Sequence, residues 1–390
     1  MILVSLSLAA STAGQPQPSA EPAPIIVTGE RLGDLRRALA ACIARHCPPN
    51  EDVDASLAVA EAEFINGDYN EAAQAIRQSL SRNRRFAATY PEPVADLYRS
   101  NARVLTHMGH DDEAERATRN ILSALREGIK QEDYRHFTAR MEVIDFLLRH
   151  RNPVEARRQL DTLAVRARAA GRDDVARAAQ MRLLRLDDLL SPNGRARRRL
   201  LQLAASADPQ QRYEMLSARL HLAALYRESG DTARADALLA DIPRPTGGER
   251  ALIYAPPYRL VTQDLQEGQD GAQGNVINRL SDVADDQWID VAYWITPEGQ
   301  VSDLEVVRRG ASANWADPLL ASIRGRRFSQ SSDGTASYRL ERYSYTAPFE
   351  VLTGSRIPRR SRRARVEFMD LTNPNETGRS PDTALAPSAD

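Results

Sequence analysis

A short turn signature recurs between residues 34 and 245 and constrains the fold more than any other feature of the sequence. It reads Gly-Asp-Tyr-Asn-Glu-Ala from Gly67, and related turns stand at Gly109, Arg151, Gly194 and Gly230. The turns are about 40 residues apart, which is the spacing of stacked helix-pair repeats. The segment therefore predicts an array of antiparallel helix pairs, with each turn joining the two helices of one pair.

The residues on either side of the turns agree with this prediction. Leu57, Ala60 and Phe64 form an apolar face before the first turn, and Ala72 begins the second helix with a small side chain that allows close packing. The Gly-Asp and Glu-Ala pairs resemble the turn of tetratricopeptide repeats, although the period is longer and Arg151 stands where glycine is usual. The resemblance implies a solenoid that serves as a binding scaffold.

A strand pattern replaces the helical one after residue 287. Ile289, Val291, Tyr293 and Ile295 occupy every second position, which is typical of a strand lying on a core. The Pro-Glu-Gly sequence that follows predicts a hairpin loop, because glycine tolerates the positive φ that such loops use. Val301 to Val307 is the expected second strand.

A short helix is expected after the hairpin. Asp317 stands at the cap position, and Pro318 suits the first helical position. Leu319 and Ile323 then lie on one apolar stripe, and Gly325 can end the helix. An Arg-Arg-Phe segment follows and restarts an extended chain.

This order of elements resembles the C-terminal domain of the TonB energy-transducer family over roughly residues 250 to 350. The resemblance implies a small antiparallel sheet with one packed helix. It also implies that an open sheet edge binds the extended N-terminal peptide of an outer-membrane receptor by strand addition. Without the resemblance, the same residues also fit an unrelated small α+β domain.

The segment from Tyr338 to Val351 is the predicted edge strand. Unpaired backbone N–H and C=O groups on such a strand can pair with another chain. The predicted peptide-binding edge comprises Tyr338, Leu340, Tyr343 and Tyr345. Packing of the aromatic side chains in the core is the alternative.

The chain is accordingly predicted to be mainly α, with a tetratricopeptide-like α-solenoid at 34–245 followed by a small α+β domain at 250–355. Residues 1–13 resemble a secretory signal, since an apolar start is followed by small residues that suit cleavage after Ala13, although a basic start is missing. An incidental apolar start is the alternative. Residues 14–33 are expected to form a linker with one short extended run.

The expected location is the periplasm, in association with the cell envelope. No run of residues approaches the ~18 apolar positions that a bilayer crossing needs, so no lasting transmembrane helix is predicted. The short run from Ile25 to Gly29 resembles a stretch near the mature N-terminus of TonB-dependent receptors. A first strand or loop edge is the alternative for this run.

Two cysteines, Cys42 and Cys47, are five residues apart with His46 between them. In an oxidising compartment they can form a disulfide, and free buried thiols or a metal site are the alternatives. Two thiols and one histidine fall short of the four ligands of a structural zinc site, so the disulfide is favoured.

Charge and motifs give no indication of catalysis. The 52 Lys and Arg residues nearly balance the 53 Asp and Glu residues, so no overall field favours nucleic acid. The sequence contains no phosphate-binding Gly-Lys loop and no Gly-x-Ser-x-Gly elbow. Adjacent carboxylates such as Asp187 and Asp188 diverge by about 100° on a helix. We therefore expect a non-catalytic protein without cofactor or metal.

The C-terminal segment, 356–390, is predicted to be an arginine-rich flank and a disordered tail. The expected basic patch comprises Arg356, Arg359, Arg360, Arg362, Arg363 and Arg365. A solvated flank and a contact with an anionic partner are both open for it.

The favoured hypothesis is an exported adaptor that binds one partner through its repeats and a receptor peptide through its sheet, linked to TonB-dependent transport. One alternative is a membrane-anchored energy transducer, which would need an anchor and a longer Pro-rich spacer than residues 14–33 supply. A cytosolic repeat scaffold is the other alternative.

Overall fold

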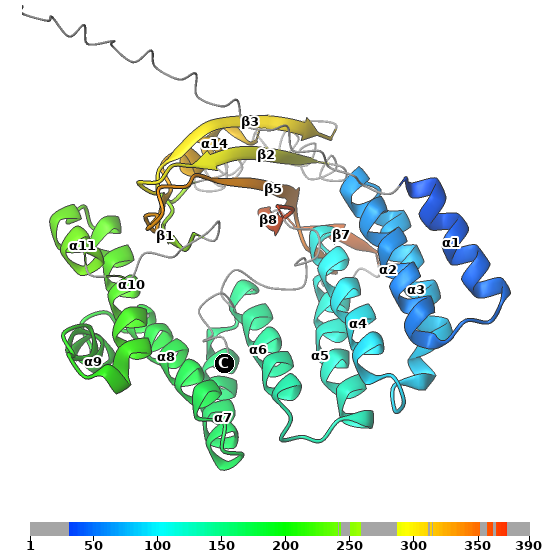
Figure 1. The fold of residues 1–390 in the computed structure, drawn as a ribbon, viewed down its shortest axis with the longest axis horizontal. Coiled ribbons are helices and arrows are strands. Elements are labelled where there is room, and N and C mark those ends of the chain that lie inside the picture. The colour runs from blue at the N-terminus through cyan, green and yellow to red at the C-terminus, as the bar shows by residue number, and fades with distance from the viewer. Residues whose placement is uncertain are drawn as a thin grey trace, which may run out of the picture.

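The fold was analysed in a computed structural model of the chain. The structure describes residues 31–240, 242, 250–258, 287–310, 313, 315–351, 357–361 and 364–372. The predicted signal segment, the run from Ile25 to Gly29 and the tail after residue 372 lie outside the described residues. Within them, helices form a curved array and a small antiparallel sheet lies across its open side (Figure 1).

The helical array consists of α1 followed by successive antiparallel pairs, from α2–α3 to α10–α11. Its helices are α1 (Leu32–Ala44), α2 (Pro49–Asn66), α3 (Tyr69–Asn83), α4 (Pro91–His107), α5 (Asp111–Gly128), α6 (Tyr134–Arg149), α7 (Pro153–Ala169), α8 (Asp173–Leu190), α9 (Arg195–Ala204), α10 (Arg212–Glu228) and α11 (Thr232–Leu239). These helices extend from Leu32 to Leu239. None of the helices in the described ranges has the length and apolar character needed to cross a membrane.

The turns of the helix pairs lie where the signature predicted them. Gly67, Gly109 and Gly230 have φ of 91°, 78° and 83°, and Arg151 takes the same left-handed conformation with φ of 55°. Gly194 differs, because it precedes α9 in an extended conformation. The signature thus marks a left-handed residue at the end of the first helix in each of the other pairs.

The alanine that follows each of these turns fills the space between the two helices of a pair. Ala72, Ala114, Ala156 and Ala235 are all completely buried. A buried methyl group allows two helices to pack closely, so the alanine of the signature serves packing.

The main sheet has four antiparallel strands in the order β3-β2-β5-β8. Its strands are β2 (Trp288–Ile295), β3 (Val301–Arg309), β5 (Ser337–Thr346) and β8 (Arg365–Asp370). Two smaller pairs flank it, formed by β1 (Leu252–Tyr254) with β4 (Arg327–Phe328) and by β6 (Phe349–Val351) with β7 (Pro358–Arg360). The mainly α solenoid followed by a small α+β domain confirms the predicted fold class.

The predicted hairpin and helix are both present. Gly299 in the β2–β3 loop has φ of 80°, and a side chain there would collide with the carbonyl of Phe328. The helix α14 (Asp317–Arg324) begins at Asp317 itself, one residue before the predicted start, and its N-cap is Ala316. Leu319 and Ile323 of α14 pack with the four predicted core residues of β2.

The predicted C-terminal boundary at residue 355 was wrong. The strands β7 and β8 lie inside the segment predicted to be an arginine-rich flank and disordered tail, and β8 pairs with β5 along its whole length. Short strands rich in arginine carry little apolar periodicity, so their pairing depends on partners that are distant in the sequence.

Candidate functional site

The sheet is docked on the turns of the first repeats, and this contact decides which parts of the chain remain available for binding. Trp288 and Asp290 point away from α14, yet they are only 8% and 0% exposed. The turns of α2–α3 and α4–α5 cover this second face, while β1 lies against α10 at the other end of the array (Figure 1). Both faces of the inner strand β2 are therefore buried.

Arg342 of β5 is the centre of this contact and is completely buried. Its guanidinium donates to the two carboxylate oxygens of Asp290 at 2.6 and 2.9 Å, and it lies 3.8 Å from the ring centre of Trp288. It also donates to the carbonyls of Phe64 and Ile65 at the end of α2. A cation at a helix C-terminus pairs otherwise unsatisfied carbonyls, so one side chain joins the sheet to the first repeat.

A second set of polar contacts joins β5 to two repeats. The Ser344 hydroxyl lies 2.7 Å from the Tyr69 hydroxyl of α3 and 2.9 Å from Nδ1 of His107 at the end of α4. Burial, together with the positive charge of Arg342, lowers the pKa of His107 to about 3. His107 is therefore neutral at physiological pH and acts as a hydrogen-bonding group of the interface.

The turn glycines of the first two pairs lie directly against the sheet. A side chain on Gly67 would collide with the indole of Trp288, and one on Gly109 would collide with the carbonyl of Ala347. The backbone N–H of Phe349 donates to the carbonyl of Gly109 at 3.1 Å. These two glycines thus supply both the left-handed turn and the room for docking.

The prediction of one basic patch was wrong for two of its arginines. Arg365 donates to both carboxylate oxygens of Asp111 at 2.6 and 2.7 Å, and Arg360 donates to the carbonyls of Met108 and Ala347. Both hold the sheet on the α4–α5 turn. Arg359 is exposed, while Arg356, Arg362 and Arg363 lie outside the described residues.

The predicted peptide-binding edge was also wrong, because β5 is an inner strand. It pairs with β2 on one side and with β8 on the other, so Tyr343 faces both Ile289 and Phe368. Tyr343 and Tyr345 are 2% and 5% exposed and belong to the core against α14. The chain's own strand β8 occupies the position predicted for a foreign peptide.

The other two residues of the predicted edge are engaged within the chain as well. The Leu340 carbonyl accepts from the backbone N–H of Leu371 at 2.7 Å, just beyond β8. Tyr338 packs edge-on against Trp294 of β2, with ring centres 5.4 Å apart. Leu340, Tyr343 and Tyr345 are therefore bonded on both sides, and the described backbone partner of Tyr338 is Trp294 of β2.

The described sheet has two edge strands, β3 and β8. Arg365 and Met369 attach β8 to the repeats, so β3 is the edge strand that lies away from them. Among the described residues, β3 pairs only with β2, and in Figure 1 it lies on the side of the sheet away from the helical array. Val306 and Val307 are 39% and 42% exposed. Two register shifts interrupt its pairing with β2, which is how exposed edges are often twisted.

A buried polar cluster lies on the core face of the sheet and was missed by the sequence analysis. Arg326 donates to Glu341 at 2.7 Å and to the hydroxyl of Tyr343 at 2.7 Å, while Tyr293 donates to Glu341 at 2.8 Å. Glu341 stands two residues before Tyr343, on the same face of β5. A charged residue at a core-facing position of a strand is the signal that could have indicated such a pair.

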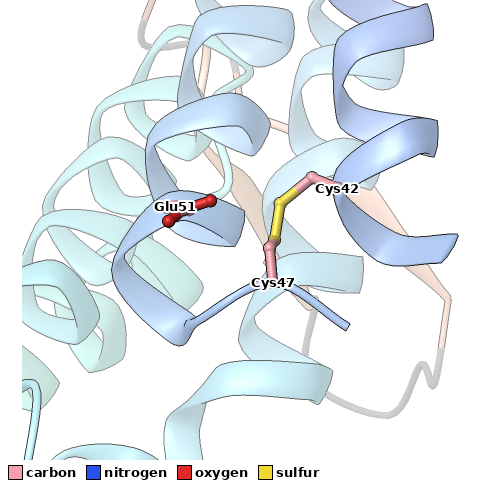
Figure 2. Close-up of side chains that lie close together, drawn as sticks. All are labelled: Cys42, Cys47 and Glu51. Atoms are coloured by element: carbon pink, nitrogen blue, oxygen red, sulfur yellow. A yellow bond between two sulfur atoms is a disulfide. The ribbon is translucent and has the colours of Figure 1, made fainter. Parts of the chain in front are cut away.

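Cys42 and Cys47 form a disulfide that joins the end of α1 to the loop before α2 (Figure 2). The two sulfurs and a carboxylate oxygen of Glu51 lie within 4.8 Å of one another. Sulfurs that are bonded to each other are not the thiolates that a metal requires, and Glu51 pairs with Arg45 at 2.7 Å. Of the three alternatives for these cysteines, the structure has the disulfide.

No family model and no curated protein matches the sequence. Among solved structures, BtubC (BKLC) from P. vanneervenii aligns with a TM-score of 0.40 and 17% identity over 56% of this chain and 94% of that chain. A putative kinesin light chain from Podosopora anserina with nearly identical TPR-like repeats gives 0.37 and 17% over 50% and 93%. The apo quorum sensor NprR from B. thuringiensis gives 0.38 and 16% over 53% and 57%. At these values no function extends from those proteins to this chain.

Proposed function

We propose that this protein is a non-catalytic, exported scaffold that binds other proteins, with the helical repeats and the sheet acting as one unit. The buried Arg342 supports the proposal that they act as one unit, because it forms hydrogen bonds to both the sheet and the first repeat. The disulfide supports export, since disulfides persist in oxidising compartments. The absence of catalysis is supported by the buried His107, Asp290 and Glu341, each of which is used in holding the fold together.

The sheet would bind an extended peptide by strand addition at β3. The observation that carries this proposal is the outer edge of β3, which has no neighbouring strand among the described residues. Its backbone groups can pair with a peptide, and the exposed Val306 and Val307 can contact alternate side chains of it. The resemblance of this region to TonB C-terminal domains favours the N-terminal peptide of an outer-membrane receptor, in connection with TonB-dependent transport.

A crosslinking experiment tests the edge. The probe is a synthetic peptide copying residues 22–30, which contain the receptor-like run, with one cysteine placed at each position in turn. Val307→Cys in β3 should form disulfides with every second probe position, because side chains alternate along an added strand. The matched control is Val351→Cys in β6, which is exposed as well and should react without alternation. Equal reaction of both variants would refute strand addition at β3.

Cell fractionation tests export separately. Recovery from the periplasm with cleavage after Ala13 agrees with an exported scaffold. Retention in the inner membrane would instead favour the membrane-anchored transducer, and recovery from the cytosol with an intact N-terminus would favour the cytosolic scaffold.

A further inference from the structure

A groove on the repeats lies apart from the sheet and its contacts. It runs between α5 and α7, with α6 as its floor, and has a volume of about 510 Å³. The floor is apolar and includes Leu122, Val143, Ile144 and Leu163. A smaller hollow of about 210 Å³ shares Val143 with it and extends it toward the α6–α7 turn. Concave sites with an apolar floor and a few polar groups are typical binding sites.

Arginines line the groove, and at one end they are already paired. Arg119 pairs with Glu115 on α5, and Arg158 pairs with Glu155 on α7. Hydrogen bonds from Arg158 and Gln159 lower the pKa of Glu155 to about 2, so this carboxylate stays charged. The positive charge at this end is therefore balanced within the protein.

At the other end Arg126, Arg140 and Arg166 converge from three different helices. Among the described residues, none of the three forms an ion pair with a carboxylate. Arg126 donates only to the carbonyl of Leu122 and the hydroxyl of Ser123 of its own helix. Burial, together with the charges of Arg166 and Arg126, lowers the pKa of Arg140. Three cations that repel one another favour an anion between them.

We propose that this groove binds an acidic segment of a partner protein, with carboxylates at Arg126, Arg140 and Arg166 and apolar side chains on the floor between α5 and α7. Guanidinium groups match carboxylates in planar, paired hydrogen bonds, and the apolar floor adds contact that a simple inorganic anion cannot use. Among the described residues, the lining of the larger groove contains no aromatic side chain on which nucleic-acid bases could stack. Phe146 in the smaller hollow is buried and stacked on His150. A peptide with alternating acidic and apolar residues therefore fits the groove.

The inference specifies where the repeats bind a partner, and so it rests on the proposed scaffold function but not on the β3 edge. Its test uses the full chain and a fluorescent hexapeptide of alternating Glu and Leu, with a Gln-Leu peptide as the neutral counterpart. Fluorescence anisotropy measures binding at low and at high salt. The acidic peptide should bind, and the neutral one should bind at least about tenfold more weakly. High salt should lower the affinity for the acidic peptide.

Two variants with the same change in charge provide the comparison. Arg126→Gln/Arg166→Gln removes groove arginines from α5 and α7, and it should lower the affinity for the acidic peptide by about tenfold or more. Arg116→Gln/Arg168→Gln removes exposed arginines outside the groove from the same two helices and should leave binding unchanged. Arg140→Gln alone should weaken binding as well. Thermal unfolding of each variant checks that the repeats remain folded.

Four outcomes would overturn the inference. They are equal binding by the groove and control variants, equal binding of the acidic and neutral peptides, no binding of the acidic peptide, and tighter binding of a single-stranded oligonucleotide through the same arginines. The Val307→Cys crosslinking is independent of these arginines. If the groove does not bind the acidic peptide but Val307→Cys crosslinks to every second probe position, the β3 proposal stands and the groove proposal does not. The reverse result would refute only the β3 proposal.

Discussion

The turns at Gly67 and Gly230 have the same signature and nearly the same backbone, but different surroundings. Both glycines are left-handed, with φ of 91° and 83°. At Gly67 the space that a side chain would need is taken by Trp288 of the sheet, whereas nothing lies within 4 Å of that position at Gly230. A local motif therefore fixes the turn, and the tertiary structure decides whether the turn is also a docking surface.

Arg342→Leu should have the largest effect on the contact between the sheet and the turn at Gly67. The change leaves Asp290 buried with Arg308 as its one ion-pair partner among the described residues, and it removes the donor for the end of α2. We expect a loss of about 3–5 kcal/mol in the free energy of unfolding, measured by urea denaturation. Arg359→Leu, at an exposed position, is the control and should change it by less than about 0.5 kcal/mol. A loss under about 1 kcal/mol for Arg342→Leu would contradict the role given to this side chain.

Alanine at the two glycines sharpens the comparison directly. Gly230→Ala should lose about 1 kcal/mol, because only the left-handed backbone opposes it. Gly67→Ala carries the same backbone cost plus a collision with Trp288, so about 2 kcal/mol more should be lost. Urea denaturation of the two variants gives the difference. Equal losses of unfolding free energy for the two variants would contradict a close contact between Trp288 and the turn at Gly67.

His107 is buried between the repeats and the sheet, and it should make the stability of the protein depend on pH. Its pKa is lowered from the ordinary 6.5 to about 3, so between these values the unfolded chain binds a proton that the folded chain does not. Stability should therefore fall as the pH falls from about 6.5 toward 3, by up to about 1.4 kcal/mol per pH unit from this group. Unfolding measured at pH 7 and pH 5 should show a smaller drop for His107→Gln than for the unchanged protein. His46→Gln, at an exposed position, should keep the full drop.

Features that depend on neighbouring residues could be predicted from the sequence. The helix pairs, the hairpin with Gly299 at its turn and the core face of β2 were all correct, because helix and strand periodicity and turn chemistry are local. The predictions that β5 is an edge strand and that the C-terminal arginines form one basic patch were wrong. The partners that changed them are β8 for β5 and Asp111 for Arg365, and the pairing of distant residues has no local signal.

The sequence by itself determined where the chain turns and which residues alternate, since steric limits on φ and the burial of apolar side chains act over a few residues. Only the tertiary structure decided which strands lie at the sheet edges and which glycines and arginines belong to an interface. It also decided which arginines have no acidic partner among the described residues. Those outcomes depend on surfaces that meet when distant segments pack, and the same arginine can be a solvated charge or the centre of a buried contact depending on what packs against it.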